Sequence, residues 1–235
     1  MNNISRMMVA VCVIWVNSAL AGGQPVMAVA EFTNTASAGW WGSGVGRELS
    51  DMLTNELVAT KAFKMVERKK LGAILTEQDM GASGRVTPST AAKIGKMTGA
   101  QYLVTGTVSA YEESVAKTGG GISYEGFSIG GKKSSAYLAI DLRVVDTTTG
   151  EIIDTRTVEG HSKGGGLGFG IHKWGFGGKL AQQKKTPAGK AIRAAIIESS
   201  NYLECSMVKK DRCMNDFEAK EQRRRDSATG ALDLE

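Results

Sequence analysis

The sequence predicts an α+β fold in which helices cover one face of a single mixed sheet. Two observations lead to this prediction. Residues 100–160 contain three segments in which apolar and polar residues alternate, a pattern typical of strands with one buried face. Outside this stretch, apolar residues recur at helical spacing behind residues that cap helices. The predicted order is β-α-β-α-α-β-β-β-α, which suits a layer of helices on one sheet.

The first predicted strand, 26–32, leads into a loop with two adjacent tryptophans. This loop spans residues 33–44 and places Trp40 and Trp41 between glycines. Ser43 is expected to cap the next helix, because a serine oxygen can accept a hydrogen bond from a free backbone N–H. That helix carries one apolar face, made by Val45, Leu49, Met52, Leu53 and Leu57.

A short strand, 63–66, and two helices complete the region before the central strands. The first of these helices, 67–80, is expected to bury Leu71, Ile74 and Leu75. The second is expected to begin at Pro88, where the missing N–H of proline is tolerated, and to end at Gly99.

The central strands are predicted at 102–111, 135–144 and 152–158, with a turn at 146–150 between the last two. A final helix follows a long connection and begins at Pro187. Its apolar face contains Ala188, Ile192, Ala195, Ile196, Ser199, Tyr202 and Leu203.

Residues 1–21 are predicted to be a cleaved signal peptide. Arg6 supplies the positive charge, residues 7–16 form the apolar core, and a small-residue cleavage site ends at Ala21. Lipidation at Cys12 is the alternative, although the residues before this cysteine match a lipidation site poorly. Both interpretations export the protein from the cytoplasm.

Composition indicates a folded exported domain, 22–215, followed by a charged tail, 216–235, expected to be an exposed helix or frayed chain. The net charge of +5 is mild for a chain of this length, so it does not predict nucleic-acid binding. In an oxidising compartment Cys205 and Cys213 are expected to form a disulfide, with two free buried thiols as the alternative. No residues have the spacing of a metal site or a catalytic group, so we expect no cofactor, no metal and no enzyme activity.

Two glycine-rich connections, 112–136 and 160–186, leave the central strands. Each is long enough for a hairpin with arms near the ~9–11 residues that a tilted membrane strand needs. Apolar and aromatic residues alternate with glycine in them, a weak signature of membrane β-strands. Mobile loops are the alternative, because glycine weakens a strand. The residues assigned to membrane hairpins are Tyr124, Phe127, Ile129, Leu167, Phe169, Ile171, Trp174 and Phe176.

Three motifs in sequence order resemble the CsgG family of curli-secretion channels. They are VERKKLGAILTEQ (66–78), GAQYLVTGTVSAY (99–111) and LRVVDTTTGEI (142–152), and the resemblance covers residues 26–203. It implies that subunits form a ring and that each contributes the two hairpins to one shared outer-membrane barrel. It also implies that unfolded polypeptide passes a constriction built from the loop after the first strand.

On this resemblance, the constriction residues are Trp40, Trp41 and Ser43. The family tends to have a polar residue and a phenylalanine at these positions, so the tryptophan pair is a departure. With four strands per subunit, the ~36 strands of the largest known barrels correspond to about nine copies. Packing of both tryptophans against the sheet is the alternative.

The leading interpretation is therefore a homo-oligomeric outer-membrane channel for secretion. Its expected partners are further copies of the chain, outer-membrane lipid, unfolded secreted polypeptide and periplasmic accessory proteins. The alternative is a soluble periplasmic accessory protein that binds a cell-envelope enzyme or a secretion partner through its loops.

Overall fold

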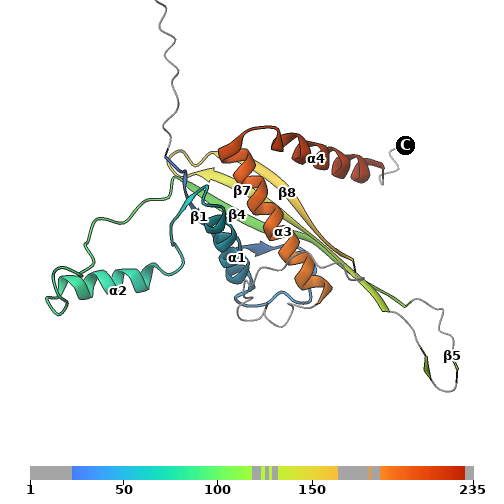
Figure 1. Ribbon diagram of the computed structural model, residues 1–235, viewed down its shortest axis with the longest axis horizontal. Helices are drawn as coiled ribbons and strands as arrows, with labels where there is room; N and C mark the ends of the chain where they lie inside the picture. The colour runs from blue at the N-terminus through green and yellow to red at the C-terminus, as the bar shows by residue number, and fades with distance from the viewer. Residues whose placement is uncertain are drawn as a thin grey trace, which may run out of the picture.

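The computed structural model describes residues 23–117, 123–124, 127–128, 132–163, 180 and 186–230. In this part of the chain, helices α1 (Val45–Thr60) and α3 (Pro187–Glu204) cover one face of a mixed sheet (Figure 1). The predicted α+β fold with a single mixed sheet is confirmed.

The sheet combines parallel strands on one side with antiparallel strands on the other. Its order is β3-β1-β4-β7-β8, and a short strand, β2, also pairs with β4. Strand β1 pairs in parallel with β3 and β4, and β2 pairs in parallel with β4, whereas β7 pairs antiparallel with both β4 and β8. The strands are β1 (Val26–Val29), β2 (Thr33–Asn34), β3 (Lys64–Met65), β4 (Tyr102–Lys117), β7 (Lys132–Asp146) and β8 (Ile152–Lys163).

The core lies between the sheet and its two helices. Four residues of the predicted α1 face, Val45, Leu49, Leu53 and Leu57, are fully buried, and Met52 is half-buried. All seven residues of the predicted α3 face are buried as well. Full burial of each large apolar side chain stabilises the fold by roughly 1.5–3 kcal/mol, which explains why these two periodic segments become helices at this place. The Thr186 hydroxyl also caps α3, since it accepts the Gly189 N–H at 3.1 Å.

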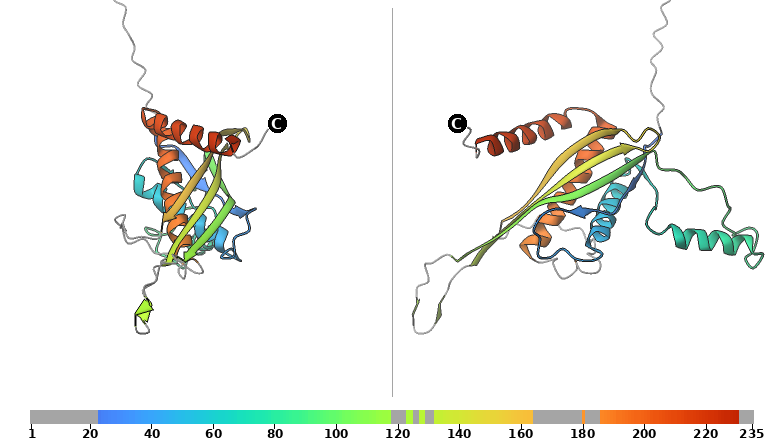
Figure 2. Two further views of the ribbon diagram at one scale, coloured as in Figure 1. Left: turned by 90° about the vertical axis from the view of Figure 1, so that its right-hand side faces the viewer. Right: turned by 180° about the vertical axis from the view of Figure 1, so that it is seen from behind.

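Strands β4 and β7 are longer than predicted. Their pairing begins at Tyr102 and Asp146 and continues to Lys117 and Lys132, past the end of the helix layer (Figure 2). One irregularity interrupts the ladder, because Ser109 is an extra residue between two paired positions of β4. Beyond the ladder, β5 (Ser123–Tyr124) and β6 (Phe127–Ser128) form a two-stranded antiparallel pair.

Two helix predictions before the central strands are corrected by the structure. Helix α2 spans Leu71–Ala82, so it begins four positions later than predicted, and Leu75 is 49% exposed rather than buried. The helix expected from Pro88 to Gly99 is absent: the Thr87 carbonyl closes a single turn, and Gly95 has a φ of 74°. Figure 1 shows that α2 and the residues after it stand clear of the sheet and of α1 and α3. Apolar residues between Pro88 and Gly99 therefore have no part of the core to pack against.

The chain ends in a helix that follows α3 closely. A π-helical turn (Cys205–Lys209) connects α3 to α4 (Cys213–Gly230), so the described part of the predicted tail is helical. Phe217 of α4 is buried, while most other α4 residues are exposed. No helix in the described ranges combines the length and the apolar content needed to cross a membrane.

Candidate functional site

The loop after the first strand folds against the sheet through tight turns. Strand β2, which takes up the start of the predicted loop, pairs with β4, and the Thr35 N–H then donates to the Val108 carbonyl at 2.9 Å. Two further backbone bonds close the loop: the Trp41 N–H donates to Ala38 O at 2.9 Å, and the Val45 N–H donates to Gly42 O at 3.1 Å. This loop of residues 35–44, the tryptophan loop, is therefore anchored at both ends.

Trp40 packs on an aromatic residue of β4. Its ring meets Tyr111 edge to face, with centroids 5.5 Å apart, and lies 5.9 Å from the ring of Trp41. The Tyr111 hydroxyl donates to a Glu113 carboxylate oxygen at 2.7 Å. Burial first, and then this bond to a carboxylate, raise the pKa of Tyr111 above its ordinary value. The nearby Trp40 indole N–H acts in the opposite direction and lowers the pKa of Tyr111, as the last of these effects. This N–H is buried, and no described residue accepts a hydrogen bond from it in good geometry.

The three predicted constriction residues differ in their surroundings. Trp40 and Trp41 are both half-buried against the core of this single chain. Ser43 is exposed, and its expected role as a helix cap is wrong: Gly44 precedes α1 with a φ of 88°, and no side chain caps the helix. A glycine suits this position because a left-handed backbone strains any residue with a Cβ.

The predicted hairpin residues lie partly within the described chain. Tyr124 and Phe127 pair with each other through their backbones in the β5–β6 pair. Near the second connection, β8 continues to Lys163, and Leu180 is fully buried in the core with its N–H donating to a Glu48 carboxylate oxygen at 2.8 Å. Sequence reasoning did not identify this buried leucine. Six residues lie outside the described ranges: Ile129, Leu167, Phe169, Ile171, Trp174 and Phe176.

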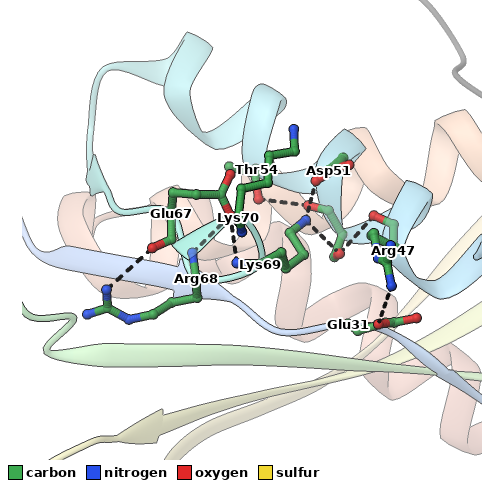
Figure 3. Close-up of polar contacts among 9 residues, drawn as sticks. Glu31, Arg47, Asp51, Thr54, Glu67, Arg68, Lys69 and Lys70 are labelled. Carbon is green, nitrogen blue, oxygen red and sulfur yellow. Dashed lines mark hydrogen bonds and ion pairs between the residues drawn. The ribbon is translucent and has the colours of Figure 1, made fainter. Parts of the chain in front are cut away.

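A polar cluster that sequence reasoning also missed joins α1 to the start of the α2 segment (residues 71–97). Figure 3 shows Lys69 directed at α1, where its ammonium donates to the Ser50 hydroxyl at 2.9 Å and pairs with Asp51. The Lys69 side chain is only 12% exposed, so its charge depends on these partners. The Ser50 hydroxyl in turn donates a hydrogen bond to the Arg47 carbonyl at 2.9 Å.

Glu67 fixes the backbone of the same turn. One of its carboxylate oxygens accepts the N–H groups of Arg68, Lys69 and Lys70, at 2.9, 2.7 and 3.3 Å. Burial raises the pKa of Glu67, but these three backbone bonds and the nearby Lys69 ammonium outweigh it, so the pKa is lowered overall. The base of the α2 segment is consequently held in one orientation on α1.

The corner between α3 and α4 is closed by a disulfide. Cys205 and Cys213 are bonded, with Cα atoms 6.0 Å apart. Beside them, Phe217 meets Tyr202 edge to face at 5.3 Å, and Arg156 donates to the Phe217 carbonyl. The only group of potential metal ligands within the described residues contains both of these cysteines, whose sulfurs are already bonded to each other. The arrangement therefore stabilises the corner and offers no thiolate to a metal.

A family model described as "Curli production assembly/transport component CsgG" matches residues 12–231. Curated CsgG proteins of Salmonella typhimurium and of Escherichia coli K12 are each 27% identical over 117 residues. Each match covers 48% of this chain and 42% of the relative, so the aligned part spans less than half of those proteins.

Solved structures with a similar course of the chain are more remote. The hypothetical protein CT253 of Chlamydia trachomatis is 13% identical, with a TM-score of 0.46 over 80% of this chain and 99% of that one. A PelC dodecamer of Paraburkholderia phytofirmans is 12% identical, with a TM-score of 0.36 over 77% of this chain and 91% of that one. Likeness at this level carries no functional argument.

Proposed function

The chain belongs to the CsgG family, and from this we propose that copies of it form an outer-membrane ring that secretes unfolded polypeptides, as curli-type subunits or adhesins. The observation that carries the proposal is the course of β4 and β7. These two strands extend past the helix layer as an antiparallel ladder (Figure 2). Their pairing continues to Lys117 and Lys132, and Ser109 is the one irregularity in it. Beyond Val108 no described strand pairs with the outer edge of β4, and in lipid only closure with a neighbouring hairpin satisfies such an open edge.

The α2 segment supplies a second reason to expect neighbouring copies. Its side chains Leu75, Met80, Ile94 and Met97 are 41–63% exposed. A 12-residue helix is marginally stable in water without a packing surface. Because Lys69 and Glu67 fix its base, the segment presents these apolar side chains in a constant direction, which suits a partner at a constant position. A neighbouring subunit of a ring meets that requirement.

The tryptophan loop is proposed as the constriction. The loop is anchored to β4, and Gly39 and Gly42 flank its tryptophan pair. It places two large aromatic rings beside the strand that continues into the first hairpin. A collar of such rings contacts almost any side chain of an unfolded polypeptide without sequence preference. A narrow apolar collar also resists wetting, so it limits the passage of ions.

The mass of the full-length protein, extracted from outer membranes in mild detergent, tests the assembly. Light scattering should give a particle several-fold heavier than the 24.9 kDa chain. Leu75→Asp combined with Ile94→Asp should reduce it to the monomer, whereas Thr76→Asp, an exposed polar position on the same helix, should not. A monomer for the unaltered chain in every detergent would favour a soluble periplasmic accessory protein instead.

A further inference from the structure

A groove follows the outer edge of the last strand of the sheet. Strand β8 pairs with β7 on one side, and no described strand pairs with its other side. The groove has a volume of about 770 Å³, and it is lined by four neighbouring β8 residues, Arg156, Thr157, Val158 and Glu159, together with His161. Successive strand residues point to opposite faces of a sheet. A groove that all of them line therefore runs along the strand edge, where unpaired backbone N–H and C=O groups are available.

Helix α4 forms the far wall of this groove and is attached at one end only. Phe217 holds the first half of α4, because it is buried beside Tyr202 and its carbonyl accepts a hydrogen bond from Arg156. The disulfide fixes the preceding turn. Further along the helix, Ser227 and Ala228 still line the groove but are exposed. Figure 2 shows the second half of α4 extending beside β8 rather than packing on it.

The groove carries positive charge that the described chain does not neutralise. Each of its three carboxylates is engaged: Glu198 with Lys220, Glu221 with Arg224, and Glu159 with the Tyr137 hydroxyl and His161.

The other two guanidinium groups of the groove form no ion pair with a described carboxylate, although Arg156 is close enough to Glu221 to contribute to the lowered pKa of that carboxyl. Among the described residues, no carboxylate lies within ion-pair distance of Arg156, which is half-buried over the rings of Tyr202 and Phe217. Likewise, no hydrogen bond or ion pair joins the exposed guanidinium of Arg223 to another described residue. Arginine at a partly desolvated site favours a carboxylate partner, because its planar fork matches the two oxygens.

We propose that this groove binds an extended acidic segment of a partner protein, which adds to β8 as a further strand. Main-chain hydrogen bonds to the β8 edge would supply affinity, as in other cases of strand addition. Every second side chain of the segment would face Arg156 and Arg223, so glutamate or aspartate at alternate positions is preferred. The intervening side chains of the segment would lie on the opposite face of the sheet, beside Thr157 and His161. The inference does not depend on the ring, since one chain contains the whole groove.

A synthetic peptide of about seven residues that alternates valine with glutamate, capped at both ends, is a suitable probe. Fluorescence anisotropy with the full-length protein should show binding that weakens as salt is added. Hydrogen exchange should show protection of the β8 amides between residues 156 and 161. The same peptide with lysine in place of glutamate, or with a central proline that removes one backbone N–H, should bind much more weakly.

Variants in and outside the groove distinguish binding in the groove from nonspecific attraction of the peptide to surface charge. Arg223→Glu should weaken binding at least about tenfold, whereas Arg212→Glu, an exposed arginine at the α4 start and outside the groove, should leave it unchanged. Ala228→Trp should block the groove without lowering the melting temperature, because this position is exposed.

Four results would overturn the proposal. They are no binding of the glutamate peptide, equal binding by Arg223→Glu and Arg212→Glu, binding without protection of β8, and equal binding of the lysine peptide. Self-association of the unaltered chain that Ala228→Trp abolishes would likewise overturn it, since the occupant would then be a second copy.

Discussion

Replacing Gly160 by alanine should destabilise the fold strongly, because the added methyl group has no room. Gly160 lies on β8 where α3 crosses the sheet, opposite Leu138 of β7. A Cβ at this position would lie 2.0 Å from the Ala191 carbonyl oxygen and 2.8 Å from the Ala195 backbone nitrogen. Both atoms belong to the α3 backbone, so no side-chain rotation relieves the clash. To reach even 3.0 Å, α3 has to retreat by about 1 Å (3.0 minus 2.0), which loosens its contacts with the core.

Overpacking of a well-filled core costs typically 1–3 kcal/mol, and a clash with backbone belongs at the upper end, about 3 kcal/mol. For a domain of this size, about 3 kcal/mol lowers the melting temperature by roughly 6–12 °C. Circular dichroism of the full-length protein measures this shift. Gly39→Ala is the matched control, since a Cβ there meets nothing within 4 Å. If Gly160→Ala melts within a degree or two of Gly39→Ala, the close approach of α3 to β8 is wrong.

Three further predictions concern the constriction, α4 and the disulfide. Trp41→Ala should raise single-channel conductance with the ring intact; unchanged conductance with a lower melting temperature would make Trp41 a packing residue. Hydrogen bonds from Arg224 and, less strongly, Arg225 lower the pKa of Glu221 to about 2, below its unfolded value of 4.5. Their stabilisation of α4 is therefore complete above about pH 4.5 and should be lost as the pH falls towards 2, a loss visible by hydrogen exchange and absent in Glu221→Gln. Cys205 and Cys213 are only 8 positions apart, so reduction should lower the unfolding free energy in urea by at most about 2.5 kcal/mol, and two alkylated thiols in unreduced protein would contradict the bond.

The elements that sequence reasoning predicted well are those whose pattern is set by burial on one face. The leucines of α1 and the alanines and isoleucines of α3 recur at helical spacing because each of these helices packs on the sheet. The strands of the β4–β7–β8 unit alternate for the same reason. The helix expected from Pro88 to Gly99 is absent because a proline start and a glycine stop are local signals. They do not form a helix where its apolar side finds no surface to pack on.

The candidate site was harder to predict, because its contacts join residues that are distant in sequence. Lys69 and Asp51 are 18 positions apart, and nothing local marks the lysine as buried. Arg156 and Phe217 are separated by 61 positions, so the groove beside α4 has no sequence signature. The tryptophan pair was identified through its glycine neighbours and the family resemblance. Its contact with Tyr111 could not be predicted, because it depends on the register of the strands in the sheet.

The extra residue in β4 decides which side chains of the first hairpin share a side. Before Ser109, the even-numbered residues Val104 and Val108 face the helices and are buried. After it the parity reverses, because Ala110 pairs with Ala139 and Tyr111 takes the position opposite Leu138. The bulge thereby turns Tyr111 towards Trp40, and it assigns Glu113 and Ser114 to opposite sides of the departing strand. If this strand enters the membrane, one inserted residue inside the domain determines which of its surfaces meets lipid and which meets the lumen.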